Sequence, residues 1–356
     1  MKELSLKYYT MSDFRLLVDS WLELESGADM TYFQTYAWYE MLWNLNKDIK
    51  DSRFEVTFAA VTQEDKVILI APLWIVKRTF GKFNRKGFYI FGRGGWSDYL
   101  NFIYKDFNDN VVTYLLKQLK DKFQLSDFYF ENVSESTRLY SYLTSVGNID
   151  SVLSSQICVG LSIDGLQFDQ YQKLLSKQSR QNIRTANNRL ARDGKSLVYD
   201  FCDSNVNLDE FTAYRSVRVA KKNDWGGKTL KWRIINFIST KILGRGWYKF
   251  AEYAPYSHDK NSKFMTAKTP DGELCASFNY GVSPDGRSIV LMGVSTNPSY
   301  SKYSPGILLL YNFIEKTIET NRYDYIDFTR GNESYKFALG GKEHKIFNIF
   351  LNLTTI

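Results

Sequence analysis

Cysteine and histidine are scarce in this chain of 356 residues. The three cysteines, Cys158, Cys202 and Cys275, are odd in number and far apart, which argues against a disulfide framework and favours reduced thiols. The two histidines, His258 and His344, do not have the spacing of zinc ligands with one another or with the cysteines. We therefore expect a protein without disulfides and without a bound metal.

Long apolar runs are missing as well. Runs such as residues 307–310 are far shorter than the roughly 20 residues that a membrane-spanning helix needs. The opening residues 1–9 lack the apolar stretch of a secretory signal peptide. Together with the reduced thiols, these absences predict a soluble cytoplasmic protein with no integral membrane span.

Low-complexity linkers are also lacking, although a length of 356 residues predicts two domains. Hydrophobic residues make up 44% of the chain and aromatic residues 16%, which is enough for packed cores and argues against disorder. The 46 basic and 39 acidic residues leave a net charge of 46 − 39 = +7. This mild excess predicts an anionic partner but is small for a nucleic-acid-binding protein.

The order of predicted elements occurs twice along the chain. The first half reads as a strand pair, a short strand, a helix and a strand, at residues 54–61, 67–76, 88–92, 108–123 and 127–132. The second half repeats this order at residues 264–269, 273–282, 288–294, 305–318 and 323–328. The interval between the third and the last strand is 38 residues from Tyr89 to Asp127 and 34 residues from Val290 to Asp324. The repetition predicts a duplicated α/β domain.

Further elements are predicted outside the repeat. Helices are expected at residues 11–25, 35–45, 168–193, 208–222 and 231–243, and strands at residues 152–163, 196–202 and 247–253. Because two comparable halves flank this middle part, we expect an N-terminal domain over residues 1–160 and a C-terminal domain over residues 161–356.

The stretch from Ser288 to Gly341 contains a strand, a turn-rich loop, a helix and a second strand. Ser304 is a suitable N-cap for the helix, Pro305 suits its first turn, and Gly306 lets another group approach the backbone closely. Free N–H groups and the helix dipole attract phosphate or carboxylate groups to such a helix start. The pattern indicates an anion site there; the alternative is a capped core helix without a ligand.

Four runs of the sequence resemble a known family. They are residues 33–38, 179–190, 304–310 (Ser-Pro-Gly-Ile-Leu-Leu-Leu) and 325–337 (Tyr-Ile-Asp-Phe-Thr-Arg-Gly-Asn-Glu-Ser-Tyr-Lys-Phe). Together they resemble the GNAT-type acyltransferases associated with polysaccharide biosynthesis, the CelD/BcsL type, which are related to the FemAB and FemX aminoacyl transferases. The resemblance implies an α/β (α+β) fold with tandem GNAT-like domains. Each domain would have a mixed, mainly antiparallel splayed sheet flanked by helices.

The resemblance also implies an acyl donor, acetyl-CoA. In this family a splayed strand pairs with the pantetheine arm, and the loop before the next helix holds the pyrophosphate. The corresponding residues here are Val294 for the arm and Ser304 and Gly306 for the pyrophosphate. The familiar glycine-rich loop is absent, and residues 300–306 stand in its place. An aminoacyl-tRNA or another thioester therefore remains open as the donor.

Acyl transfer to an amine needs a base for the ammonium group and a proton for the departing thiolate. Tyr335 is the expected proton donor, and Asp327 or Glu333 the expected base. Arg330 and Lys336 would orient the substrate or pair with these two acids. The alternative for Asp327 is a strand-end carboxylate that accepts from N–H groups of its own loop.

A basic helix is the expected acceptor site. Lys177, Arg180 and Arg184 are spaced at three and four residues, so they share one helical face. Asp98 lies in the loop of the first half that corresponds to the donor loop, and it would also contact the acceptor. The alternatives are a solvated charged face and a carboxylate that caps a turn.

Three functions follow from these residues. The first is an N-acyltransferase that moves an acyl group, expected to be acetyl, from acyl-CoA to an amine of a sugar precursor or polysaccharide unit. The second is a Fem-like aminoacyl transferase that acts on a cell-wall precursor with charged tRNA; Ala338 after Phe337, where Fem enzymes carry a lysine, argues against it. The third is a non-catalytic protein that binds an anionic glycan or RNA.

Overall fold

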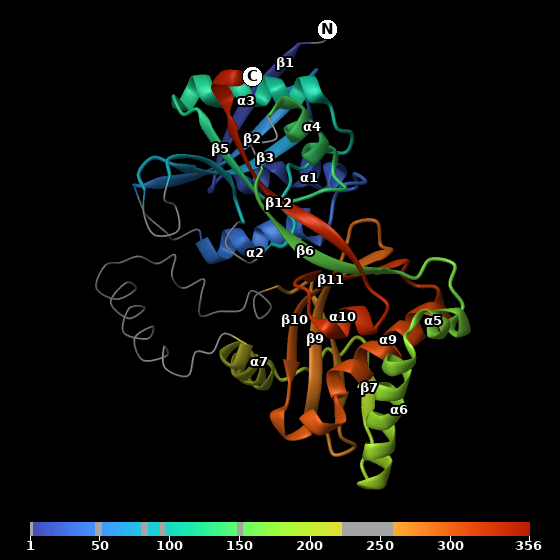
Figure 1. Ribbon diagram of the computed structural model, residues 1–356. Helices are drawn as coiled ribbons and strands as arrows, with labels where there is room; N and C mark the ends of the chain where they lie inside the picture. The colour runs from blue at the N-terminus through green and yellow to red at the C-terminus, as the bar shows by residue number, and fades with distance from the viewer. Residues whose placement is uncertain (1–2, 47–51, 80–84, 93–96, 148–151, 223–258) are drawn as a thin grey trace. The chain divides into compact units, whose positions relative to one another are not determined.

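The computed structural model describes residues 3–46, 52–79, 85–92, 97–147, 152–222 and 259–356. The helix and strand predicted at residues 231–243 and 247–253 lie outside the described residues. The described chain has a mixed α/β fold in which a large, mostly antiparallel sheet is flanked by helices (Figure 1). The predicted fold class is therefore confirmed. Among the described helices, none combines the length and the apolar character that crossing a membrane requires.

The chain separates into two compact units. Unit 1 comprises residues 1–158, 283–285 and 344–356, and unit 2 comprises residues 159–282 and 286–343. The first transition follows Cys158, whereas the sequence predicts it after residue 160. Residues 344–356 return to unit 1, although the sequence predicts them in the C-terminal domain. The reason is the last strand, whose apolar residues pair with a strand of unit 1.

Unit 1 contains five strands in chain order before the chain reaches unit 2. They are β1 (Leu4–Thr10), β2 (Phe54–Gln63), β3 (Lys66–Val76), β4 (Gly87–Ile90) and β5 (Asp127–Ser134). Its helices are η1 (Phe14–Leu17), α1 (Val18–Leu24), η2 (Tyr32–Gln34), α2 (Tyr36–Asn46), α3 (Asp109–Phe123), α4 (Arg138–Val146) and the terminal η9 (Leu353–Thr355). The first four strands pair antiparallel, and β4 pairs parallel with β5. Helix α3 packs on β1 and β2, and α1 packs on β3.

Unit 2 is built from the middle of the chain. Its strands are β7 (Val198–Asp200), β8 (Lys263–Lys268), β9 (Leu274–Val282), β10 (Ser288–Thr296) and β11 (Tyr325–Arg330). Its helices are α5 (Phe168–Leu174), α6 (Lys177–Arg192), α7 (Leu208–Lys222), η8 (Pro298–Tyr303), α9 (Pro305–Thr320) and α10 (Ser334–Ala338). As in unit 1, the first four strands pair antiparallel, and the fourth pairs parallel with the fifth.

A backbone detail supports the internal repetition. Asn132 of β5 has φ +52° and Thr329 of β11 has φ +58°, a left-handed conformation that residues other than glycine rarely adopt. The two residues follow Asp127 and Asp324 by the same interval, since 132 − 127 and 329 − 324 both equal 5. Because these two aspartates are the residues that the sequence repeat aligns, the unusual backbone recurs at the same place in both halves.

The strand order is β1-β2-β3-β4-β5-β12-β6-β11-β10-β9-β8-β7. Strands β6 (Val152–Ser162) and β12 (Lys342–Asn352) have 11 residues each and contribute to both units. Each of these two strands therefore begins in one unit and ends in the other.

The helices of unit 2 cover both faces of its strands. Tyr280 of β9 contacts Phe313 of α9, with ring centroids 5.8 Å apart. The next residue, Asn279, points to the opposite face because side chains alternate along a strand. Its cross-strand partner Phe264 contacts Phe211 of α7, with ring centroids 5.3 Å apart. Helices α9 and α7 therefore lie on opposite faces of the sheet, as Figure 1 shows.

Candidate active site at the start of helix α9

Strands β10 and β11 diverge in the middle of unit 2. They pair in parallel from Ser288 with Tyr325 to Val290 with Asp327. Beyond this point, β10 continues to Thr296 along β9, with an irregular register between Leu291 and Gly293. A bulge increases the local twist of a strand and bends it. The splayed strand that the sequence predicts is therefore present.

The start of α9 lies beside the splayed part of β10. Ser304 occupies the N-cap position, but it has φ +50° and ψ +49°, and its side chain caps no N–H group of the helix. The predicted capping hydrogen bond is thus wrong, because the left-handed backbone that follows η8 turns the serine away from the first helical turn. The N–H of Gly306 is not satisfied by the hydroxyl of Ser304, and it lies at the positive end of the helix dipole.

A cavity of about 230 Å³ opens at this helix start. The described residues that line it are Arg218, Phe278, Val294, Thr296, Ser301, Ser304, Pro305, Gly306, Ile307 and Tyr335. The structure thus brings together all three residues predicted to hold the donor, Val294, Ser304 and Gly306, with one of the predicted catalytic residues, Tyr335. We call this cavity the α9 pocket.

Gly306 leaves room in the α9 pocket. A Cβ added at this position would lie 3.6 Å from Oγ1 of Thr296 and 3.8 Å from Cε2 of Phe278, which is ordinary van der Waals contact. Thr296 and Phe278 also line the pocket, so a side chain at residue 306 would enter the space that a ligand needs. The glycine is therefore important for access to the backbone and not for the fold.

Tyr335 is the second residue of α10 and contributes a hydroxyl group to the α9 pocket. Burial raises the pKa of Tyr335 to about 12, the guanidinium group of Arg218 opposes this rise, and Glu333 adds to it. The side chain therefore keeps its proton across the physiological range and can donate it. No local sequence pattern connects Arg218 with this site, because Arg218 lies on α7, more than 100 residues before Tyr335.

Asp327 has a partner within its own loop. The carboxylate is 6% exposed, and Oδ1 accepts a hydrogen bond of 2.6 Å from the N–H of Thr329. The hydroxyl of Thr329 donates to the carbonyl of Leu291 at 2.9 Å. These contacts correspond to the alternative considered from the sequence, in which the aspartate shapes the end of its strand. Neither Asp327 nor Glu333 is among the described residues that line the α9 pocket.

The side chain of Lys336 stabilises the loop after β11. Its side chain is buried, and its ammonium group donates to the carbonyls of Thr329 at 3.0 Å, Arg330 at 2.8 Å and Gly331 at 3.0 Å. It also lies 3.1 Å from Oε2 of Glu333. A lysine ammonium group has three protons, so three carbonyls occupy its donors. These contacts correspond to the alternative considered from the sequence, in which Lys336 pairs with a nearby acid.

We expect Lys336→Met to destabilise the protein. The change leaves three carbonyls without their donor and Glu333 without its cation, and breaking a buried ion pair typically costs about 3–5 kcal/mol. Urea unfolding measures the difference, with exposed Lys342→Met as the matched control. Wild-type stability of Lys336→Met would contradict the structural role of this lysine.

The C-terminal end of α6 braces η8, the segment that leads into the α9 pocket. Oδ2 of Asp193 accepts from Nζ of Lys302 and from the hydroxyl of Tyr303, both at 2.8 Å. Nη1 of Arg189 donates to the carbonyl of Lys302 at 3.1 Å. Lys302, Tyr303 and Arg192, in this order, hold the pKa of the Asp193 carboxyl well below its usual range. The brace is therefore complete above about pH 4 and is lost as the pH falls toward the lowered pKa.

We expect Asp193→Ala to loosen the segment before α9. Without the carboxylate, Lys302 and Tyr303 lose a shared acceptor, so the amides of residues 298–306 should exchange with deuterium on the order of tenfold faster. Exposed Asp271→Ala is the matched control in the same unit. An unchanged exchange rate in Asp193→Ala would show that other contacts hold this segment.

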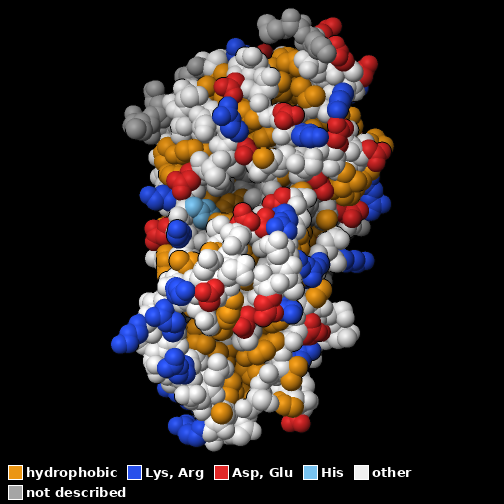
Figure 2. Space-filling view, turned by 90° about the vertical axis from the view of Figure 1, so that its right-hand side faces the viewer, with side chains coloured by type: hydrophobic (Ala, Val, Ile, Leu, Met, Phe, Trp, Pro, Cys, Tyr) orange, Lys and Arg blue, Asp and Glu red, His pale blue; other side chains and the backbone are white. Residues whose placement is uncertain are grey.

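The predicted acceptor residues lie at the other end of α6. Lys177 and Arg184 are exposed, whereas Nη1 of Arg180 donates to the carbonyls of Gln172 at 3.0 Å and Leu175 at 2.6 Å. Arg180 thus fastens the end of α5 to the start of α6. Figure 2, on whose near side α6 lies, shows Lys and Arg side chains gathered on the lower part of this face.

The two remaining predicted residues lie outside the α9 pocket. Arg330 ends β11, and its carbonyl accepts from Lys336. Asp98 belongs to unit 1 and is half-buried in the segment between β4 and α3.

Comparison with known families agrees with the geometry of unit 2. Residues 177–337 match the family described as the acetyltransferase (GNAT) domain. This range contains every described residue that lines the α9 pocket, from Arg218 to Tyr335. None of the curated proteins matches the chain.

Solved structures share the fold over nearly the whole chain. FemX is similar with a TM-score of 0.55 and 13% identity, over 98% of this chain and 98% of FemX. A conserved protein of unknown function from Bacteroides thetaiotaomicron is similar with a TM-score of 0.51 and 11% identity, over 98% of this chain and 99% of that protein. The chain therefore shares its fold with these solved structures, and residues 177–337, which match the acetyltransferase (GNAT) domain, contain the pocket at the start of α9.

Proposed function

We propose that this protein is an N-acyltransferase that moves an acetyl group from acetyl-CoA to an amine of a sugar precursor or polysaccharide unit, as in the CelD/BcsL type. One observation supports this most strongly: a splayed strand, an uncapped helix start and a half-buried, protonated tyrosine meet in the α9 pocket. The strand offers a partner for an extended amide chain, the helix start offers a site for an anion, and the tyrosine is a proton donor.

The donor would lie along β10 and end at α9. Beyond Val290, the side of β10 that faced β11 no longer pairs with it, so the backbone near Val294 is available to the amide groups of pantetheine. The pyrophosphate would accept from the backbone N–H group of Gly306, where the helix dipole is positive, whereas the N–H of Ile307 donates to the carbonyl of Ser304 at 3.0 Å. Arg218 adds a cation to the same pocket.

Tyr335 would supply the proton of the reaction. The amine nitrogen attacks the thioester carbonyl, the carbon–sulfur bond breaks, and the departing thiolate takes the proton of the Tyr335 hydroxyl. Because the pKa of Tyr335 is raised to about 12, the hydroxyl is protonated when the thiolate forms. The amine gives up its proton to water. The tyrosine then regains a proton from water.

Asp327 and Glu333 act through the loop after β11 in this proposal. Asp327 fixes the turn at Thr329, and Glu333 holds Lys336, so both position α10 and with it Tyr335. We therefore assign them as positioning residues and not as the base. The acceptor would bind as the free amine, and the rate would rise with pH as the amine loses its proton.

The exposed part of the basic face on α6 would hold the anionic end of the acceptor. Arg184 lies nine residues before Asp193, which touches the donor segment, so the two positions are about 13 Å apart along the helix. A sugar carried on a nucleotide diphosphate or lipid diphosphate is long enough for that distance. Arg184 offers a planar group that suits phosphate oxygens, and Lys177 adds a second cation.

Mass spectrometry of products tests the function. Acetyl-CoA is incubated with nucleotide-linked amino sugars, and a product heavier by one acetyl group is expected. Lys177→Gln/Arg184→Gln should raise the KM for the acceptor several-fold and leave the affinity for acetyl-CoA unchanged. Transfer from charged tRNA but not from acetyl-CoA would support the Fem-like alternative, and binding without any transfer would overturn the proposed enzyme.

A further inference from the structure

Unit 2 contains a second cavity, of about 500 Å³, on the sheet side of the C-terminal half of α9. Phe313 and Thr317 of α9 line it, whereas the α9 pocket is lined by Pro305, Gly306 and Ile307 at the other end of the same helix. Phe313 follows Gly306 by seven residues, so the two cavities are about 10 Å apart along the helix. The volume lies in the range typical of small-molecule sites.

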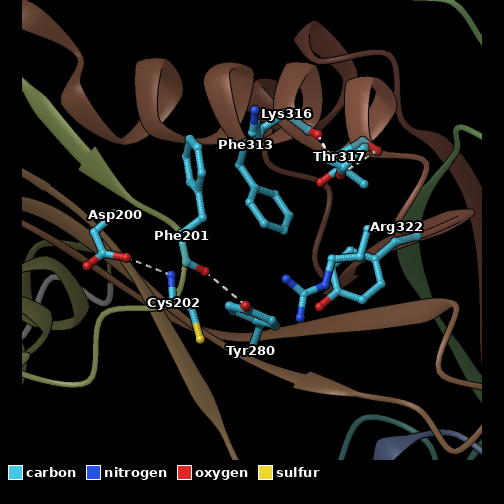
Figure 3. Close-up of a pocket in the computed structure, with 10 residues that line it drawn as sticks. Asp200, Phe201, Cys202, Tyr280, Phe313, Lys316, Thr317 and Arg322 are labelled. Carbon is cyan, nitrogen blue, oxygen red and sulfur yellow. Dashed lines mark hydrogen bonds between the residues drawn. The ribbon is translucent and has the colours of Figure 1, made fainter.

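Aromatic rings form the walls of this cavity. Phe313 is at their centre, with ring centroids 5.6 Å from Phe201, 5.8 Å from Tyr280 and 6.5 Å from Tyr323. Three of the four rings, those of Phe313, Tyr280 and Tyr323, are buried within the protein. Figure 3 shows the rings of Phe201 and Phe313 side by side beneath the helix, with Tyr280 below them. Such walls favour a planar aromatic ligand, since offset and edge-to-face ring contacts add to burial of apolar area.

One cation points into the cavity. The guanidinium group of Arg322 lies over the ring of Tyr323, 5.3 Å from its centroid, and Figure 3 shows it directed to the space beneath Phe313. Lys316 also lines the cavity, but its ammonium group lies 3.3 Å from Oε2 of Glu319. The flat, forked guanidinium group suits a carboxylate.

Two further polar side chains of the walls, those of Asp200 and Tyr280, have partners. Oδ1 of Asp200 accepts from the N–H of Cys202 at 2.9 Å, and Figure 3 shows this carboxylate on the far side of Phe201 from Arg322. The hydroxyl of Tyr280 donates to the carbonyl of Phe201 at 2.9 Å. A carboxylic acid bound at Arg322 would therefore be close to a cation and three aromatic rings and farther from the carboxylate of Asp200.

We propose that this cavity is a second ligand site, separate from the α9 pocket, which binds a planar aromatic carboxylic acid. The ring of the ligand lies against Phe313 and Phe201, and its carboxylate pairs with Arg322. The proposal does not depend on the identity of the acyl donor or of the acceptor.

Calorimetric titration with 2-naphthoate tests this site. Wild type should bind the probe, and exposed Arg322→Gln should weaken binding about tenfold, because a charge-assisted hydrogen bond is lost. Phe313→Leu should also weaken it, and exposed Arg138→Gln in unit 1 is the matched control. The neutral 2-naphthamide should bind about tenfold more weakly than 2-naphthoate.

Four outcomes would overturn the proposal. Equal binding of 2-naphthoate to wild type and Arg322→Gln, or no binding at all, would remove the site. Tighter binding of decanoate than of 2-naphthoate would replace the aromatic ligand with an acyl chain. Loss of 2-naphthoate binding in Gly306→Val would place the probe in the α9 pocket, whereas retained binding in that variant supports a separate site.

Discussion

Replacing Gly306 with valine is expected to abolish the binding of acetyl-CoA and leave the fold intact. A Cβ at residue 306 meets Thr296 and Phe278 at ordinary contact distances, so the protein has room for a Cβ at this position. The two methyl groups would fill the α9 pocket, where the pyrophosphate must reach the backbone. Valine also has a better helix propensity than glycine, so the helix itself loses nothing. Thermal unfolding with and without acetyl-CoA measures both effects.

The matched control is Asn110→Val. Asn110 is the second residue of α3, as Gly306 is the second residue of α9, and it is exposed in unit 1. This variant should keep the full stabilisation by acetyl-CoA. Gly306→Ala should give an intermediate result, because one methyl group takes less of the pocket. Normal binding of acetyl-CoA to Gly306→Val would mean that the donor site is elsewhere.

Replacing Tyr335 with phenylalanine is expected to lower kcat about 10²–10⁴-fold, the usual cost of a lost general acid. The rings have the same shape, so binding of acetyl-CoA should be unchanged. Because burial raises the pKa of Tyr335 to about 12, the hydroxyl is protonated below that pH. The rate of the wild type should therefore rise as the acceptor amine deprotonates and should not fall near pH 10, where an ordinary tyrosine ionises.

Tyr199→Phe is the matched control for this experiment. Tyr199 lies in the same unit, burial raises its pKa to about 12 as well, and it does not line the α9 pocket. Its removal should leave kcat within a factor of two, as a rough expectation for a residue outside the site. A folded Tyr335→Phe enzyme with full turnover at all pH values would remove Tyr335 from the mechanism.

Much of the fold can be predicted from the sequence because the patterns are local. Strands β2 and β3 are runs of β-branched and aromatic residues on either side of a polar turn, and α3 begins after Asn108, whose side chain caps the helix. Strands β1 and β12 are harder to predict. Their apolar residues alternate weakly, and their place is decided by partners distant in the chain, β2 for the first and β5 for the second.

The residues of the site can be predicted from the sequence only where they lie in one continuous segment of the chain. Val294, Ser304, Gly306 and Tyr335 follow one another along a strand, a loop and two helices, and they meet in one pocket. The sequence could not tell that Lys336 is buried, because a lysine after a tyrosine in a polar loop looks the same when it faces solvent. Nor could it identify Arg218, which reaches the pocket from a helix on the opposite face of the sheet.

Hydrogen–deuterium exchange with and without acetyl-CoA tests the central claim most directly. If the α9 pocket holds the donor, acetyl-CoA slows exchange in peptides that cover residues 293–307 and 334–338 of the wild-type protein. The pantetheine arm protects the amides near Val294, and the pyrophosphate protects the amide of Gly306. Unchanged exchange in these peptides, or protection confined to other segments, would contradict the assignment of this pocket as the donor site.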